Sequence, residues 1–269
     1  MKKVTVSFVA LLAACVALAA PAKNDGPTGI IQTANGSTRG SLRWKNGAKE
    51  YVVTNEKNMT VTFKADDVES VVVDRPAALD GAIKKVQTNS GVGAALPVLE
   101  KIAKDYAHLT YDKEATAWLA RAYLLQGNAA KAVSACETVI RDDPEAAYKG
   151  DVAVTYWDAL IKAGNSSKLK TFLDKAIASG DSTSAAFALV KRGDDIMARG
   201  SSRANCEEAL RDGYLRVILL YADSRSEAYA EALYKGAKAF EGMGQSSRAS
   251  RLRDQLKAEC GASDWARKQ

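Results

Sequence analysis

The stretch LARAYLLQGNAAKAVSACETVIRDDP, residues 119–144, has the pattern of two short helices joined by a turn. Apolar residues recur every three or four positions on both sides of Gly127. Small residues at Ala120 and Ala132 allow the two predicted helices to approach closely, and Gly127 permits the turn. Pro144 ends the second helix because proline lacks the backbone N–H that a helix interior requires. The stretch therefore predicts a helical hairpin.

The same helical period extends from Ala77 to about Cys260, with Gly-Asn, Gly-Ser and Gly-Gln breaks at intervals. The predicted helices are 78–88, 92–107, 113–126, 128–141, 149–163, 165–179, 183–199, 203–221, 225–243 and 246–260. Pro97 lies inside the second of them, so that helix is expected to begin near it or to kink there. Residues 77–269 are therefore predicted to form an all-α solenoid of helical hairpins.

The residues of the hairpin resemble the tetratricopeptide repeat, with cysteine where a larger side chain is usual. The matching residues are Leu119, Ala120, Tyr123, Gly127, Ala132, Cys136 and Pro144. Weaker matches follow at Trp157, Leu160, Gly164 and Leu169, at Gly193, Ile196 and Gly200, and at Ala237, Phe240, Gly244 and Ala249. The resemblance implies a stack of such repeats, which is a fold that typically binds other proteins and performs no catalysis.

The turn glycines Gly127, Gly164, Gly200 and Gly244 are 37, 36 and 44 residues apart, whereas the family repeat has about 34. The repeats are therefore irregular. As a class, residues 77–266 are similar to envelope tetratricopeptide proteins. Examples are the lipoprotein component of the outer-membrane barrel-assembly machinery and the Tol-Pal-associated periplasmic coordinator. The β-rich N-terminal part belongs to neither protein.

In this family, partner peptides lie on the concave side of the stack, which is lined by the first helix of each pair. The resemblance implies that the residue after each small motif residue contacts the partner: Arg121, Asp158, Asp194 and Lys238. One turn earlier on each helix it implies Ala117, Val154, Val190 and Tyr234. The alternative is that these mixed charges are ordinary solvated positions.

Before residue 77 the apolar pattern has a period of two, which indicates short strands. Asn35-Gly36 and Asn46-Gly47 are typical of tight hairpin turns. About five strands within residues 29–73 favour a small SH3-like or Sm-like β-barrel, with a short helical turn at residues 65–68 before the last strand. We therefore predict an α+β chain with a barrel over residues 23–76.

Residues 1–22 have the order of a secretory signal peptide: Lys2 and Lys3, an apolar run, then small residues. Within it, the segment ending at Cys15 resembles a bacterial lipobox, so lipidation of Cys15 is the alternative to simple cleavage. We expect export to the periplasm, with outer-membrane or peptidoglycan association open. Cleavage lowers the formal net charge from +6 to +4, which is not typical of a nucleic-acid-binding protein.

The motifs of catalysis and cofactor binding are missing from the sequence. His108 is the only histidine, and neither a phosphate-binding glycine loop nor a Cys-x-x-Cys motif occurs. The adjacent acids at Asp142-Asp143 and Asp194-Asp195 point about 100° apart on a helix, so they cannot flank one substrate. Cys206 and Cys260 should lie too far apart for a disulfide. We therefore predict no enzyme, no cofactor and no metal.

Two functions are consistent with these patterns. In the first, an exported scaffold binds protein or peptide partners in the cell envelope through its solenoid. In the second, the barrel binds cell-wall glycan and the helices act as a spacer, with Trp44 as the residue that would stack on a sugar ring. Trp118 and Trp157 lie at helical core spacing, and all three tryptophans are predicted to be core residues. The sequence leaves the oligomeric state open.

Overall fold

The computed structural model describes residues 26–224 and 226–268. The chain divides into two compact units, Met1–Val71 and Val72–Gln269, so the boundary lies a few residues before the predicted one at 76. The predicted signal peptide, residues 1–22, and the alternative lipidation site Cys15 lie outside the described residues.

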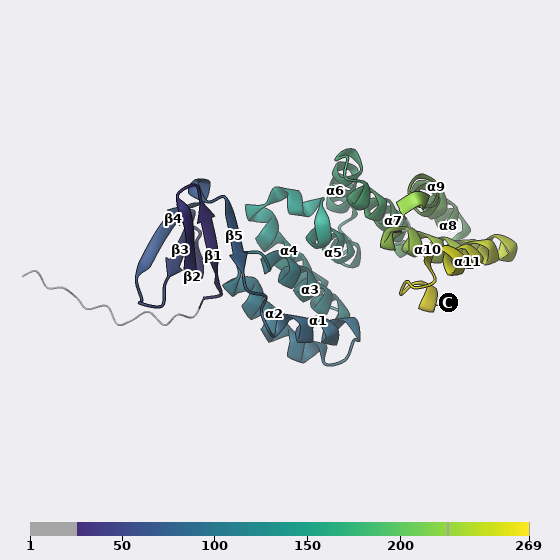
Figure 1. The fold of residues 1–269 in the computed structure, drawn as a ribbon. Coiled ribbons are helices and arrows are strands. Elements are labelled where there is room, and N and C mark those ends of the chain that lie inside the picture. Colours follow the sequence, from purple (N-terminus) through teal and green to yellow (C-terminus); the bar gives the residue numbers. More distant parts are fainter. Residues whose placement is uncertain (1–25, 225, 269) are drawn as a thin grey trace, which may run out of the picture. The chain divides into compact units, whose positions relative to one another are not determined.

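The predicted strands are present as one antiparallel meander joined at one edge by the last strand (Figure 1). The strands are β1 (Thr28–Thr33), β2 (Gly36–Lys45), β3 (Glu50–Thr54), β4 (Thr60–Lys64) and β5 (Ser70–Val73). At the first predicted hairpin, Thr33 pairs with Gly36, and Gly36 has a φ of 127°. The expected helical turn is a 3₁₀ turn at Ala65–Asp67. The five strands are therefore as predicted, whereas the turns differ in detail: Gly36 already pairs as the first residue of β2, and in the second connection the positive φ is at Lys49 rather than at Gly47.

The predicted closed barrel is not observed. The strand order is β4-β3-β2-β1-β5, so β4 and β5 lie at the two edges of an open sheet. The predicted apolar face of β4 is largely uncovered, with Met59 56% and Val61 44% exposed, whereas Leu42 and Val53 are buried. Alternating apolar residues predict a strand, but they do not show where in the sheet the strand lies. At the edge, β4 has a neighbouring strand on one side only, so less of its apolar face is buried.

The helical unit consists of hairpins whose helices agree closely with the predicted ranges (Figure 1). The helices are α1 (Leu79–Gln87), α2 (Val92–Asp105), α3 (Asp112–Leu125), α4 (Ala129–Asp142), α5 (Gly150–Lys162), α6 (Ser166–Ala178), α7 (Ser182–Ala198), α8 (Arg203–Ala209), α9 (Leu215–Leu220), α10 (Glu227–Gly242) and α11 (Ser246–Cys260). Helix α2 begins at Val92 and continues through Pro97. None of the described helices has the length and apolarity needed to cross a membrane.

One predicted helix, 203–221, is interrupted. A π-helical turn at Leu210–Tyr214 separates α8 from α9. It brings Gly213 against Gly193 of α7: a Cβ added to Gly213 would lie 2.8 Å from the Gly193 Cα. Periodicity did not predict this turn, because each of its residues is compatible with an ordinary helix.

The turns between paired helices repeat one hydrogen-bond pattern. At the end of α3, the Gly127 N–H donates to the Leu124 carbonyl and the Asn128 N–H donates to the Tyr123 carbonyl, at 3.0 and 2.9 Å. The Asn128 side chain then accepts from the Lys131 N–H and caps α4. Gly164-Asn165 repeats the arrangement between α5 and α6. The Gly-Asn dipeptide therefore ends one helix and begins the next.

Replacing Gly127 with alanine is expected to lower the free energy of unfolding by about 1 kcal/mol. Gly127 has a φ of 74°, a conformation that strains a residue with a Cβ atom, although no neighbouring atom lies within 4 Å of such a Cβ. Urea denaturation would measure the change. Gly127→Asn is the matched control and should lose less, because asparagine tolerates this backbone conformation. Equal stability of Gly127→Ala and the parent chain would contradict the prediction.

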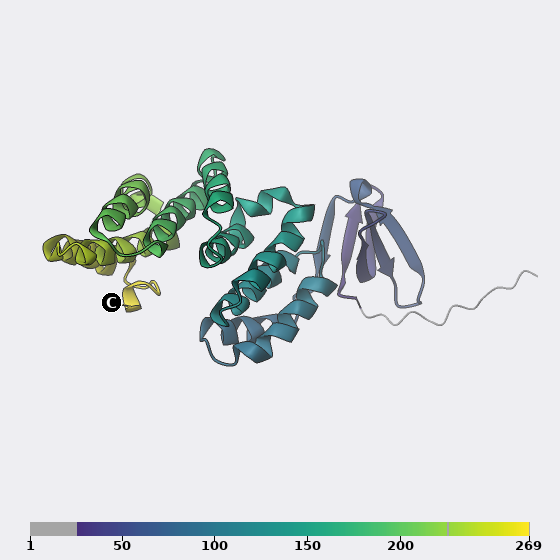
Figure 2. The same ribbon diagram turned by 180° about the vertical axis from the view of Figure 1, so that it is seen from behind.

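The first helices of successive pairs pack against one another in a continuous inner row, with α3 on α5, α5 on α7 and α7 on α10. Helices α2, α4, α6 and α11 each pack against the inner helix of their own pair. Viewed from behind, α10 and α11 form the last pair, with the C-terminal segment, residues 263–268, beside them (Figure 2). Trp157 on α5 is wholly buried, as predicted, and its indole N–H donates to the Ala147 carbonyl at 3.0 Å.

Candidate functional site

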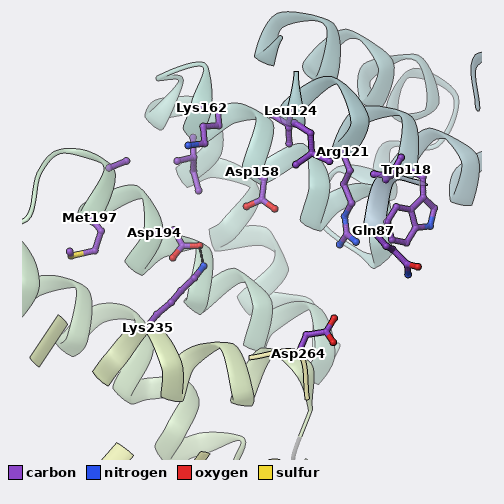
Figure 3. Close-up of a pocket in the computed structure, with 14 residues that line it drawn as sticks. Gln87, Trp118, Arg121, Leu124, Asp158, Lys162, Asp194, Met197, Lys235 and Asp264 are labelled. Carbon is purple, nitrogen blue, oxygen red and sulfur yellow. Dashed lines mark hydrogen bonds and ion pairs between the residues drawn. The ribbon is translucent and has the colours of Figure 1, made fainter. Parts of the chain in front are cut away.

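An open groove with a volume of about 1030 Å³ runs along the inner row of helices. Its lining comes from α1, α3, α5, α7, α10 and the C-terminal segment, as Figure 3 shows. The lining residues are Val86, Gln87, Trp118, Arg121, Leu124, Leu125, Asp158, Ile161, Lys162, Asp194, Met197, Ala198, Lys235 and Asp264. The groove thus draws residues from helices far apart in the sequence.

The lining follows one rule on three successive inner helices. The first residue lies six positions before the turn glycine, as Arg121 does before Gly127. The residues three and four positions later also line the groove. The three sets are Arg121, Leu124 and Leu125 on α3, Asp158, Ile161 and Lys162 on α5, and Asp194, Met197 and Ala198 on α7. Residues spaced by three and four lie on one face of a helix, so each inner helix presents one polar and two further side chains to the groove.

The α3 and α5 end of the groove combines cations with apolar side chains. The Arg121 guanidinium lies 4.8 Å from the centre of the Trp118 ring. Neither Arg121 nor Lys162 has an ion-pair partner in the part of the chain that the structure describes. Both residues are exposed, beside half-buried Leu124 and Ile161. This end can therefore accept an apolar side chain together with a negative charge.

The α7 and α10 end contains a buried network of charges. The Lys191 Nζ lies 2.9 Å from Asp158 Oδ1, 3.2 Å from Glu231 Oε1 and 3.7 Å from Asp194 Oδ2. The Lys235 Nζ lies 2.5 Å from Asp194 Oδ2 and also contacts Glu231. The side chains of Lys191 and Glu231 are only 6% and 5% exposed. Each buried charge thus has a partner of opposite sign.

The network shifts the pKa values of Glu231, Lys191 and Tyr214 in directions that follow from their partners. Burial alone would raise the pKa of Glu231, but Lys191 and Lys235 lower it to about 2. Burial alone would lower the pKa of Lys191, but Asp158, Glu231 and Asp194 raise it above its usual range. The Tyr214 hydroxyl donates to Asp194 Oδ1 at 2.9 Å, and burial and Asp194 raise the pKa of Tyr214. At neutral pH, Glu231 is therefore ionised, Lys191 is protonated and the Tyr214 hydroxyl is neutral.

The structure places the predicted partner-contact residues in three different situations. Arg121, Asp158 and Asp194 line the groove. Ala117, Val154 and Val190 are buried in the core and do not line it. A step of four residues toward the N-terminus turns the side chain by about 40°, which on these helices moves it from the groove face into the contacts between helices. The further lining residues lie one turn later, not one turn earlier.

The last repeat departs from the predicted register. Lys238 is exposed but does not line the groove, where Lys235 lies instead. The step to this repeat is 44 residues, and it contains the π-helical turn at Leu210–Tyr214. Tyr234 is half-buried against Trp265, with ring centroids 5.4 Å apart. The residue six positions before the turn glycine therefore lines the groove in three repeats and does not in the fourth.

Sequence reasoning assigned Trp118 to the core and did not single out Leu124, Ile161, Lys162 or Lys235. Trp118 is half-buried and lines the groove. The missed residues on α3 and α5 could have been found by continuing the motif toward each turn glycine rather than away from it. Lys235 could not have been found in this way. It lies nine positions before its turn glycine, Gly244, rather than six, so counting from the glycine does not reach it.

The other candidates for chemistry lie elsewhere. Cys136, Cys206 and Cys260 are buried, and none of them forms a disulfide within residues 26–224 and 226–268. Burial and Glu137 raise the pKa of Cys136 to about 12, so its thiol is protonated at neutral pH. The His108 Nε2 lies 3.3 Å from Asp142 Oδ2, away from the groove. Across residues 26–224 and 226–268, no group of three or more histidine, cysteine or acidic side chains is arranged to hold a metal.

Comparison with known proteins gives a family match within the helical unit. Residues 92–153 match the family model described as the tetratricopeptide repeat, and this range covers α2, α3, α4 and the beginning of α5. No curated protein matches the chain significantly.

Two solved structures are similar to the chain, both of the nearly identical TPR-like repeats of a kinesin light chain candidate from Podosopora anserina. The first, a variant with a single substitution, is 18% identical, covers 68% of this chain and 92% of its own, and has a TM-score of 0.48. The second is also 18% identical, covers 70% and 95%, and has a TM-score of 0.45. The family match supports tetratricopeptide repeats in the helical unit, and residues 92–153 are the segment in which it is found.

Proposed function

We propose that the chain is a non-catalytic scaffold that binds an extended segment of a partner protein in the groove of its helical unit. Tetratricopeptide repeats commonly serve as protein-interaction scaffolds. The observation that carries the proposal is the repeated lining of α3, α5 and α7, in which a polar side chain and two further side chains recur along one face. A peptide in extended conformation presents side chains at regular intervals and fits such a lining.

The chemistry of the partner follows from the groove. Around Arg121, an apolar side chain can contact Trp118 and Leu124 while a carboxylate pairs with the guanidinium. Toward α10 the lysines are already neutralised by Asp158, Asp194 and Glu231. The partner segment is therefore expected to be acidic and apolar at the α3 end and polar at the α10 end.

The place of action is a further part of the proposal. The N-terminal order of basic, apolar and small residues in residues 1–22 favours export, so the partners are expected in the cell envelope. Signal-peptide processing and lipidation of Cys15 can be distinguished by the mass of the mature N-terminus.

Arg121→Glu is expected to weaken partner capture at least tenfold, or about 1.4 kcal/mol, because it removes a cation that is free to pair and replaces it with a repelling charge. The measurement is co-purification after mild crosslinking of the tagged full-length chain, with mass spectrometry of the recovered proteins. Arg251→Glu is the matched control: it makes the same charge reversal at an exposed position of α11 outside the groove and should change capture less than twofold.

Unchanged capture by Arg121→Glu, with unchanged thermal unfolding, would exclude the groove as the binding site. Recovery of glycan without a defined protein would favour the alternative in which the sheet binds cell wall. The structure gives that alternative less support, because the cavity of about 460 Å³ on the sheet is lined by Thr28, Arg39, Gly40, Ser41, Thr54, Asn55, Glu56, Lys57 and Met59, with no aromatic ring for a sugar to stack on. Trp44 is half-buried against Tyr51.

A further inference from the structure

The chain folds back after its last helix. Helix α11 ends at Cys260, the Ser263 N–H donates to the Cys260 carbonyl at 2.9 Å, and a short 3₁₀ turn follows at Ala266–Lys268. This return carries Trp265 to α10, where its ring centroid lies 5.4 Å from that of Tyr234, at an interplanar angle of 42°. The C-terminal segment, residues 263–268, thus contacts a helix of the inner row.

The indole of Trp265 lies among cations and one carboxylate. The Lys235 Nζ is 5.4 Å from the centre of its ring, and the Lys268 Nζ of the same segment is 3.8 Å away. Partial desolvation and Asp264 raise the pKa of Glu227, and a hydrogen bond from the Trp265 side chain opposes that rise. The ring of Trp265 therefore has Tyr234 and two lysines as neighbours.

This contact occupies a position at the end of the groove. Lys235, which lies over the indole, also lines the groove and pairs with Asp194. Asp264, next to Trp265, lines the groove as well. The chain's own indole therefore lies on a residue that lines the groove, and the segment that carries it supplies part of the lining at this end.

We propose that the C-terminal segment is a built-in occupant of the groove end: Trp265 fills a socket formed by Tyr234 and Lys235, and a partner that follows the whole groove displaces it. The displacement step rests on the proposed function, whereas occupancy of the socket does not. The apolar residues of the segment that pack against the core of the later helices are Trp265 and Ala266. The short tether of the segment to α11 supplies an effective concentration on the order of millimolar. We expect the segment to stay bound when no partner is present and to be displaced by a partner that makes more contacts with the groove.

The test uses the full chain with Trp265→Ala and a fluorescently labelled peptide of residues 261–268. The variant leaves the socket empty, so it is expected to bind the peptide in a fluorescence anisotropy titration. The unaltered chain, whose own segment competes, should bind at least tenfold more weakly. A peptide with alanine in place of its tryptophan is the matched control and should bind to neither chain. Equal binding to both chains, or no binding to a folded Trp265→Ala chain, would overturn the proposal.

A second measurement holds even where the variant folds poorly. The unaltered chain is labelled with 5-fluorotryptophan, and the ¹⁹F resonance of Trp265 is assigned with Trp265→Phe. A resonance that lies away from that of the free peptide, and that moves toward it when excess unlabelled peptide is added, supports the socket. A Trp265 resonance that coincides with the free peptide from the start contradicts it. If Arg121→Glu leaves partner capture unchanged while the peptide still binds Trp265→Ala, the proposed function fails and the socket stands.

Discussion

Replacing Lys191 with methionine is expected to lower the free energy of unfolding by about 3–5 kcal/mol at neutral pH. Lys191 is buried, and its ammonium group lies within ion-pair distance of Asp158, Asp194 and Glu231. Methionine preserves much of the side-chain volume but leaves Glu231, which is 5% exposed, with Lys235 as its remaining cation. Urea denaturation followed by circular dichroism would measure the loss.

Lys170→Met is the matched control for this prediction. Lys170 pairs with Asp174 four residues later on α6, but its side chain is 77% exposed, so its removal should change stability by less than about 0.5 kcal/mol. Similar losses from the two substitutions would show that the network contributes nothing beyond a surface ion pair.

The pH dependence gives the Lys191 prediction a second test. The folded chain holds the pKa of Glu231 at about 2, below its ordinary value, so the stability that this carboxylate contributes is lost as the pH falls toward 2. In Lys191→Met the same carboxylate protonates more readily, because burial is opposed by one lysine rather than two. The difference in unfolding free energy between the two chains is therefore expected to shrink from pH 7 to pH 5. A constant difference would indicate lost packing rather than an uncompensated charge.

Replacing Gly213 with alanine is expected to lower the free energy of unfolding by about 2–3 kcal/mol. The added Cβ would lie 2.8 Å from the Gly193 backbone nitrogen and 2.9 Å from the Leu189 carbonyl oxygen. These are backbone atoms that cannot rotate away, so α7 and the π-helical turn would have to separate. The strain acts against a gain of about 1 kcal/mol from the better helix propensity of alanine.

Gly81→Ala provides the comparison, because Gly81 lies in α1 with no neighbouring atom within 4 Å of an added Cβ. It should leave the chain as stable as before or slightly more stable. The measurement is the melting temperature of both variants and of the parent chain. A melting temperature of Gly213→Ala equal to that of Gly81→Ala would show that the close approach of α7 and the π-helical turn is not maintained in solution.

Local rules were sufficient for much of the helical unit. Gly127 and Gly164 mark turns because only glycine enters this backbone conformation without strain, and the following Asn128 and Asn165 cap the next helix. Such signals depend on neighbours in sequence, so the sequence predicts them. The π-helical turn depends on a contact with Gly193 from another helix, and nothing local to residues 210–214 indicates it.

The candidate site was predicted in part for the same reason. The family offsets selected Arg121, Asp158 and Asp194, which line the groove, because the repeat is nearly regular over these helices. The buried network could not be predicted, since Lys191 receives its carboxylates from three helices. The only sequence feature that pointed to the network was that Lys191 follows the apolar residue Val190 within a predicted core helix. The closed barrel was wrong because alternation does not report what covers an edge strand.

Helix α7 belongs to both hydrophobic cores of the helical unit. Ala188 packs in the core formed by the earlier helices, whereas Leu189 and Val190 pack in the core formed by the later ones. In a linear array of repeats, each repeat stabilises only its neighbours. Because α7 packs in both cores, it couples the unfolding of the earlier helices to that of the later ones. Weakening it should divide a single unfolding transition into two, and amide hydrogen exchange would then distinguish an early half from a late one.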